Sequence, residues 1–370
     1  MRKQPLLNIS VKKLINFPFL SKVKKCYYFV VESDISLERG FILKNLLFVS
    51  LCMILLVGCN KDKEITSNES ELAASETNNE VVNPNTEDLL VNLPDSIKEQ
   101  VATQLNKTQS TITASDLGEI KSLSIGENVD IKSIISLTEN LESLNVYVPV
   151  ADWSFLQDAI NLKELTIQQN DLTDLTFIRE LKSLETLSIY ESNLTSLNGI
   201  ETLTNLQNLI ISQNNVNDLS PLQNLSKLSS LDIADNEMIS LSPIQNHSKL
   251  TELAIDRNPI QDYSLLASLQ NLTYLSMIES NVATLDFVSD MHHLQRLLIP
   301  GTQISDLSVL AHKKHLQYLD IRDTKVVTVK PLLPLEELQF LILDKKLVQD
   351  WSLLENKEGL TISENIILAQ

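Results

Sequence analysis

Cysteine and glycine are scarce in this sequence of 370 residues. The three cysteines are Cys26, Cys52 and Cys59, so the long segment after Cys59 has no disulfide bond of its own. The seven glycines form no phosphate-cradling loop, and the motifs H-E-x-x-H and G-x-S-x-G are absent. We therefore predict that the protein is not an enzyme, and that apolar burial rather than disulfide bonding holds its fold together.

Basic residues are in the minority, with 30 lysines and arginines against 48 aspartates and glutamates. Nine of the basic and three of the acidic residues precede Cys59, which leaves 21 basic and 45 acidic residues from that cysteine onward. Nucleic acids and anionic lipid surfaces attract proteins with clustered lysine and arginine. The composition therefore argues against a nucleic-acid partner and against broad adhesion to anionic lipid.

The longest apolar run extends from Leu46 to Gly58 and follows Lys44. A basic residue, an apolar stretch and a small residue are the parts of an export signal, and this run is too short to span a bilayer comfortably. The four residues 56–59 resemble the lipobox of bacterial lipoproteins. We predict a lipoprotein signal peptide at 43–58, acylation of Cys59 with chains such as palmitate, and anchoring on the extracytoplasmic face of the cell membrane. The alternative is a buried helix with an inert Cys59.

Residues 1–42 precede this signal, although export signals normally have only a short basic segment there. Two interpretations stay open. Glu38, Arg39 and Gly40 can be encoded by a purine-rich run that resembles a bacterial ribosome-binding site ahead of Leu43, in which case 1–42 are not translated. Otherwise they form a long basic leader. Residues 59–93 are rich in Asn, Glu, Ser and Thr and lack aromatic residues, which predicts a disordered tether.

A 22-residue repeat fills most of the remaining sequence. Its first leucines are Leu162, Leu184, Leu206, Leu228, Leu250, Leu272, Leu294, Leu316 and Leu338, and shorter units begin at Ile120 and Leu141. The frame L-x-x-L-x-I, followed by a polar residue and further apolar residues, is the leucine-rich repeat pattern. One unit cannot bury its own leucines, so neighbouring units must stack. We predict an α/β solenoid of about eleven repeats at 120–359, with a curved parallel sheet on the concave face and short helical or extended turns on the convex face.

Two polar columns support this register. Eight residues into each unit lie Asn170, Ser192, Asn214, Asn236, Asn258, Ser280, Thr302 and Thr324. Twelve residues into each unit lie Asp174, Ser196, Asp218, Ser240, Asp262, Thr284, Asp306, Thr328 and Asp350. We predict that the first column hydrogen-bonds the backbone that turns after each strand, and that the second provides N-caps for short convex helices.

Both ends of the repeat array are expected to carry caps. In the segment 94–119, Pro94 and Asp95 precede apolar residues at helical spacing, namely Ile97, Val101 and Leu105. This pattern predicts a helical N-terminal cap that begins at about Ser96 and covers the first repeat. The last half-unit, 360–370, is predicted to serve as a C-terminal cap.

Short motifs give the repeats a family resemblance. The stretches LNK, TIT and DL ahead of the first repeat, and the 22-residue units with DLSPL at 218–222, resemble internalin-type bacterial surface proteins. The resemblance covers roughly 93–360 and implies the solenoid fold and a binding role. Internalins commonly carry an immunoglobulin-like domain after the repeats, and many end in a wall-sorting motif. This sequence shows neither, so we assign anchoring to Cys59.

The ligand site is expected on the concave face, to which positions two, four and six of each unit point. On four consecutive units, position two holds Tyr274, Arg296, Tyr318 and Phe340, flanked by Ile278, Leu298, Arg322 and Ile342. Aromatic residues and arginines dominate binding hot spots. We predict that a protein or glycan ligand binds Tyr274, Ile278, Arg296, Leu298, Tyr318, Arg322 and Phe340. The alternative is that Phe340 and Ile342 lie under the C-terminal cap while the tyrosines only pack across strands.

A secondary acidic patch is predicted in the middle of the concave face, made of Asp232, Asp235, Glu252 and Asp256. Such a patch suits a basic partner or Ca²⁺, although the sequence has no compact calcium-loop motif. A solvated face partly neutralised by Arg257 is the alternative. We predict no metal and no cofactor. His247 and Lys313 replace leucine at an apolar offset, which predicts local fraying or an opening there.

These features together predict a membrane-anchored lipoprotein, monomeric, whose solenoid binds a protein or glycan on its concave face. The alternative is an envelope structural or regulatory protein that binds a neighbour through its acidic convex or mid-concave side, without a dedicated concave ligand. An enzyme is the remote alternative, because one repeat scaffold serves unrelated functions.

Overall fold

The computed structural model describes residues 93–364. The predictions for residues 1–42, for the signal peptide at 43–58 with Cys59, and for the tether up to residue 92 lie outside these residues. Leu93, the last residue of the predicted tether, is only 4% exposed and packs in the core, so that prediction is one residue too long. Within 93–364, no helix has the length and apolar character needed to cross a membrane.

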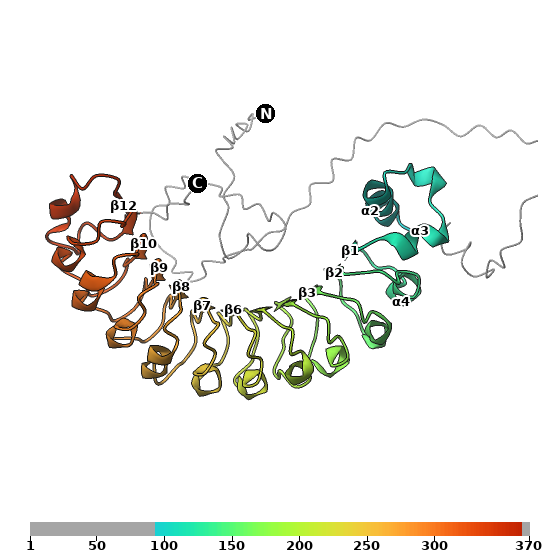
Figure 1. Cartoon of the computed structure of the whole chain (residues 1–370), viewed down its shortest axis with the longest axis horizontal. Coiled ribbons are helices and arrows are strands. Elements are labelled where there is room, and N and C mark those ends of the chain that lie inside the picture. Colours follow the sequence, from blue (N-terminus) through green and yellow to red (C-terminus); the bar gives the residue numbers. More distant parts are fainter. Residues whose placement is uncertain (1–92, 365–370) are drawn as a thin grey trace, which may run out of the picture. The chain divides into compact units, whose positions relative to one another are not determined.

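Twelve parallel strands form one sheet in residues 93–364, in the same order as in the sequence. They are β1 (Ser122–Ile125), β2 (Ser143–Val146), β3 (Glu164–Gln168), β4 (Thr186–Tyr190), β5 (Asn208–Ile210), β6 (Ser230–Asp232), β7 (Glu252–Ala254), β8 (Tyr274–Ser276), β9 (Arg296–Leu298), β10 (Tyr318–Asp320), β11 (Phe340–Ile342) and β12 (Thr361–Ser363). The strands line the concave side of the arc in Figure 1. The predicted leucine-rich repeat solenoid is confirmed, and β12 extends the sheet beyond the eleven strands expected.

Short helices accompany each strand. Three of those in residues 93–364 are α-helices: α2 (Asp95–Leu105), α3 (Ala114–Glu119) and α4 (Ile131–Ile135). The others are 3₁₀ helices: η2 (Gln109–Thr111), η3 (Ser154–Asp158), η4 (Thr176–Ile178), η5 (Ile200–Thr202), η6 (Ser220–Leu222), η7 (Ser242–Ile244), η8 (Ser264–Ser268), η9 (Asp286–Val288), η10 (Ser308–His312), η11 (Lys330–Leu332) and η12 (Trp351–Leu354). Figure 1 shows α4 and the turns after it on the convex side.

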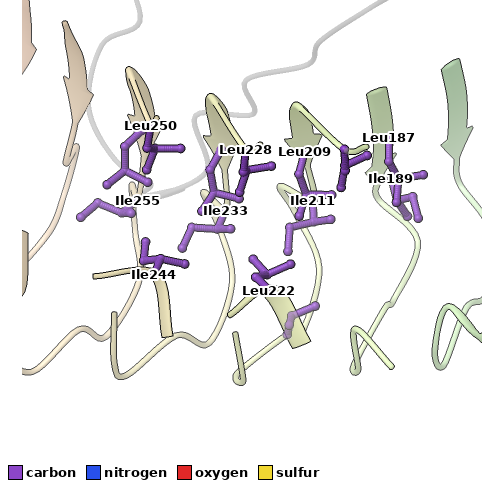
Figure 2. Packing of buried hydrophobic residues seen from close by; sticks show 14 of the residues in the cluster. Leu187, Ile189, Leu209, Ile211, Leu222, Leu228, Ile233, Ile244, Leu250 and Ile255 are labelled. Carbon is purple, nitrogen blue, oxygen red and sulfur yellow. The ribbon is translucent and has the colours of Figure 1, made fainter. Parts of the chain in front are cut away.

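The core is one continuous cluster of leucine and isoleucine side chains between the sheet and the convex turns. Figure 2 shows Leu209 and Ile211 of one unit beside Leu187 and Ile189 of the preceding unit. All four side chains are completely buried. Burial of each contributes roughly 1.5–3 kcal/mol. The core side chains of each unit are covered by the units on either side. The core therefore forms only when the units stack into the sheet.

The first polar column hydrogen-bonds the backbone as predicted, except at Ser280, whose buried hydroxyl has no hydrogen-bond partner among the described residues. In Asn236, Oδ1 accepts from the amide of Val216 at 3.0 Å and Nδ2 donates to the carbonyl of Ile211 at 2.8 Å. Asn258 repeats the arrangement one unit later, accepting from Met238 at 2.9 Å and donating to Ile233 at 2.8 Å. Each asparagine therefore joins the backbones of adjacent turns in the interior.

Most of the second polar column lies one residue earlier than an N-cap, although Asp350 is itself the N-cap of η12 and Ser196 lies three residues before the N-cap of η5. Oδ1 of Asp218 accepts from the amide of Ser220 at 2.8 Å, whereas the N-cap of η6 is Leu219. The same bond to the residue two positions on recurs at Asp174, Asp262 and Asp306. These aspartates form Asx turns that start the 3₁₀ helices, so the predicted N-caps are displaced by one position.

Helix α2 occupies the segment predicted as the N-terminal cap and covers the open edge of β1. Its Ile97 and Val101 are completely buried. On the same helix, Gln100 accepts from the amide of Ser124 at 2.8 Å and donates to the Ser124 carbonyl at 2.9 Å. Gln104 bonds the amide and carbonyl of Ser122 at 3.1 and 2.6 Å. The two glutamines thus replace the hydrogen bonds that a further strand would make.

The prediction of local fraying or an opening at His247 and Lys313 was wrong. The two residues are 4% and 2% exposed, respectively. Nζ of Lys313 donates to the carbonyl of Ser289 at 2.6 Å, and Nε2 of His247 lies 3.1 Å from the carbonyl of Leu222. Burial lowers the pKa of both side chains. Each polar side chain therefore bonds the preceding turn where leucine would only pack against it.

Candidate functional site on the concave face

Strands β8–β11 place the four predicted position-two side chains in register. Tyr274 pairs with Arg296, Arg296 with Tyr318, and Tyr318 with Phe340. Neighbouring parallel strands are about 4.8 Å apart, so side chains in register lie in contact on one face. The four residues form a row across the later half of the sheet, which we call the aromatic–arginine row.

Arg296 lies between two tyrosine rings in this row. Its guanidinium carbon is 4.8 Å from the ring centre of Tyr318 and 5.9 Å from that of Tyr274. The rings of Tyr318 and Phe340 continue the row with centres 6.0 Å apart. Contacts of a guanidinium with aromatic faces are attractive and strengthen when water is excluded. Nε of Arg296 is nevertheless buried without a hydrogen-bond partner among the described residues.

The solvent exposure of the side chains in and beside the row differs from the expectation that all of them point to the concave solvent side. Tyr318 is 5% exposed and Ile342 is completely buried, so neither side chain points freely to solvent. Arg296 and Phe340 cover Tyr318, and Ile342 lies between Asp320 and the last strand, β12. Because the strands are close, large side chains cover their neighbours. Tyr274, Arg296 and Phe340 remain half-buried, and Ile278 and Leu298 lie half-buried beside them.

Arg322 is held by an aspartate that the sequence analysis did not single out. Its Nη2 and Nε donate to Oδ2 and Oδ1 of Asp320 at 2.6 and 3.0 Å. Asp320 is only 2% exposed, so the pair is bidentate and largely desolvated. The signal was present, because residues two apart on a strand share one face. Arg322 therefore has its charge compensated, whereas Arg296 contacts two tyrosine rings and forms no ion pair with the described residues.

The predicted acidic patch divides into separate structural contacts. Asp235 pairs with Arg257 through two hydrogen bonds, one of them from Nη2 at 2.6 Å. Asp256 is 8% exposed, and its Oδ1 accepts from Oγ of Ser276 at 2.6 Å and from the amide of Ile278 at 2.7 Å. These carboxylates therefore fix the backbone and one arginine rather than forming an open ligand cluster.

Burial changes the ionisation of the two carboxylates that lie deepest in the patch. It raises the pKa of Asp232 to about 7 and that of Asp256 to about 6. Burial also raises the pKa of Tyr274, and that of Tyr318 to about 12, so both phenols stay neutral. Glu252, the fourth predicted residue, pairs in register with Tyr274. The middle of the concave face is therefore less negative near neutral pH than its composition indicates.

Comparison with solved structures finds internalins among the proteins with a similar fold. An internalin (inlF) from Listeria monocytogenes shares 25% identity with a TM-score of 0.60, covering 74% of this chain and 95% of its own. An internalin C2 (inlC2) from the same organism shares 24% identity with a TM-score of 0.40, covering 68% and 93%. No protein-family model matches the sequence, and no curated protein matches it. The chain has an internalin-type leucine-rich repeat fold.

In this internalin-type solenoid, the described residues include no group of three or more His, Cys, Asp or Glu side chains arranged to hold a metal ion. Most of the predicted concave residues lie on β8–β11, with Ile278 and Arg322 two residues after a strand, whereas the acidic patch is centred on β6 and β7. The two sets adjoin each other, because Glu252 pairs in register with Tyr274 and Asp256 accepts from the amide of Ile278. The apolar and cationic surface on β8–β11 is suited to binding.

Proposed function

We propose that this protein is a lipid-anchored, extracytoplasmic binding protein that captures a protein partner on its concave face at the aromatic–arginine row. The row provides an arginine and two half-buried aromatic rings, and the aliphatic side chains of Ile278 and Leu298 lie beside it. Arginine and aromatic residues account for most of the energy in protein interfaces, and they cluster near the interface centre. This mixture favours a protein partner over a glycan.

Arg296 carries the proposal. Its side chain is only half-buried and forms no ion pair with the described residues, so the guanidinium keeps an uncompensated charge. A carboxylate or carbonyl oxygen of a partner would pair with the exposed part of that guanidinium at the centre of the row. The aromatic rings of Tyr274 and Tyr318 hold the guanidinium in place beforehand, so little side-chain freedom is lost on binding.

Substitution of Arg296 by alanine is expected to weaken capture of the partner by roughly 30-fold or more, as for an interface hot spot. A photo-crosslinking amino acid at Leu298 in the full chain should form a discrete protein adduct in intact cells, and the adduct should be lost in Arg296→Ala. Arg179→Ala is the matched control, because Arg179 is exposed and pairs with Glu180 in a convex turn at 3.8 Å. An equal adduct in Arg296→Ala and the parent would contradict the proposal.

The anchoring part of the proposal rests on the sequence around Cys59. Cells that express Cys59→Ala are expected to lose label from a fatty-acid analogue and to release the protein from the membrane fraction, because one thioether-linked group and its acyl chains would provide the anchor. Cys52→Ala is the control, because that cysteine lies within the apolar run. If the Cys59→Ala protein remained labelled and membrane-bound, the lipoprotein assignment would be wrong.

A further inference from the structure

A shallow groove of about 740 Å³ lies along the N-terminal edge of the sheet, where the chain enters strands β5–β9. It shares no residue with the aromatic–arginine row. Its cationic or ionisable side chains are Lys227, Lys249 and His293, each of which lies three residues before a strand. None of the ten lining residues is acidic, although the whole chain has 48 acidic and 30 basic residues. We call this feature the basic rim groove.

The protein itself does not neutralise the lysines of the basic rim groove. Nζ of Lys227 donates to the neutral amide oxygen of Asn205 at 2.7 Å. Lys249 forms no ion pair with the described residues, and it is exposed. At one end of the groove, the lining residue Gln207 donates to Oε2 of Glu185 at 3.2 Å. At physiological ionic strength charges act over about 8 Å, so acidic residues farther away than that are largely screened from the groove. An anion in the groove would therefore meet two uncompensated ammonium groups on adjacent turns.

Hydroxyl groups line the floor of the groove with their oxygens available. Ser229, Thr251 and Thr273 donate to the backbone carbonyls of Gln207, Ser229 and Thr251 at 3.2, 3.1 and 3.1 Å, respectively. Because each hydroxyl proton is used by the preceding strand, each hydroxyl oxygen retains lone pairs for an outside donor. Sugar hydroxyls are such donors, whereas phosphate and carboxylate oxygens are not. The floor therefore favours hydroxyl-bearing ligands, and the lysines favour anionic ones.

We propose that the basic rim groove binds an acidic glycan, a polymer with carboxylate or phosphate groups and free hydroxyls. The lysines lie on two adjacent units and the hydroxyls on three, with neighbouring strands about 4.8 Å apart, so a linear polymer would meet like groups on successive turns of this part of the sheet. The groove is independent of the partner site at the aromatic–arginine row. A protein with both sites would hold a glycan at its rim and a protein on its concave face.

Polygalacturonate is the probe, and its binding to the chain from Cys59 onward is measured by isothermal titration calorimetry. We expect it to bind, with neutral dextran binding at least roughly tenfold more weakly, and Lys227→Ala with Lys249→Ala to weaken binding roughly tenfold. The matched control is Lys325→Ala with Lys330→Ala, which removes the same charge from exposed positions outside the groove. Arg296→Ala should bind polygalacturonate like the parent, so this result does not depend on the partner site.

Polyphosphate separates a glycan site from a general anion site. Thr251→Val with Thr273→Val should weaken polygalacturonate binding roughly threefold and leave polyphosphate binding unchanged, because only the sugar uses the hydroxyl oxygens. If polyphosphate bound as tightly as polygalacturonate and the valine variant bound both normally, the groove would be a general anion site and the glycan proposal would be overturned. Absence of polygalacturonate binding, or equal loss in the Lys325 and Lys330 control, would also overturn it.

Discussion

Gly199→Ala is expected to lower the melting temperature of the solenoid by roughly 5 °C or more, which corresponds to a loss of about 3 kcal/mol in unfolding free energy. Gly199 has φ +108°, a conformation that other residues rarely adopt. A Cβ atom there would lie 2.2 Å from the carbonyl oxygen and 2.4 Å from the carbonyl carbon of Leu175. Both contacts are to backbone in the preceding turn, so no side-chain rotation relieves them.

The location of Gly199 explains why neighbouring units cannot move apart to make room. It precedes η5, and the adjacent Asn198 accepts a hydrogen bond from the amide of Leu175 at 2.9 Å. Widening the gap for a methyl group would break that bond and separate core leucines on both sides. Thermal unfolding, with amide exchange measured over β3–β5, would locate the damage in these turns.

Gly126→Ala provides the matched control for Gly199→Ala. A Cβ atom at Gly126 would meet no atom within 4 Å, and the backbone there is not in the positive-φ region. We expect that variant to differ from the parent by less than about 0.5 kcal/mol in unfolding free energy. If both alanine variants melted with the parent, the close backbone approach at Gly199 would not be a constraint on the fold.

Asp256→Asn is expected to stabilise the fold at pH 8 by about 2 kcal/mol and to have little effect at pH 4. Burial raises the pKa of Asp256 from 3.8 to about 6 in the folded protein. The folded state therefore favours the protonated acid, and the stability that this provides is complete below about pH 4. It is lost as the pH rises through 6, because ionisation is easier in the unfolded chain.

The hydrogen bonds of Asp256 make asparagine a suitable replacement. Ser276 and the amide of Ile278 both donate to Oδ1, at 2.6 and 2.7 Å, and the amide oxygen of asparagine accepts both. Urea unfolding from pH 4 to pH 8 should show the parent and the variant diverging between pH 4 and pH 6. Parallel stabilities across that range would show that ionisation of Asp256 does not oppose folding.

Asp152→Asn serves as a control of opposite sign. Hydrogen bonds from the amide and hydroxyl of Ser154 lower the pKa of Asp152, and its side chain is exposed. Any stability that this carboxylate provides is present above its ordinary pKa and lost in acid. The Asp152→Asn variant should therefore be less stable than the parent at pH 8. Opposite directions in the two variants would exclude a general effect of removing negative charge.

Most of the fold could be predicted from the sequence, because the 22-residue period gives the same position in every unit an equivalent place in the structure. Once Leu231, Leu253 and Leu275 are aligned, strand register and the row of Tyr274, Arg296 and their neighbours follow without further information. The asparagine column follows for the same reason, because a buried polar residue that recurs once per turn needs recurring backbone partners. Periodicity thus determines which residues are neighbours.

Exposure could not be predicted in the same way. Tyr318 and Phe340 occupy the same position in their units, yet Tyr318 is 5% exposed and Phe340 is half-buried. The difference depends on the size of the side chains on the two adjacent strands, which an alternating pattern does not express. Asp256 also lies at a position expected to be open. It is buried because its carboxylate accepts hydrogen bonds from Ser276 and Ile278 of the next unit, which the pattern does not express either.

The glutamine contacts of helix α2 bear on how many repeats such a protein can have. Outside their own helix, Gln100 and Gln104 bond only main-chain groups of residues 121–124, and every strand of the sheet presents the same kind of main-chain groups. These contacts therefore do not depend on the side-chain identity of the strand that the helix covers, although Ile97 and Val101 also pack in the core. Units can be gained or lost further along the sheet while the same starting piece is retained, so the length of the binding surface is free to change in evolution.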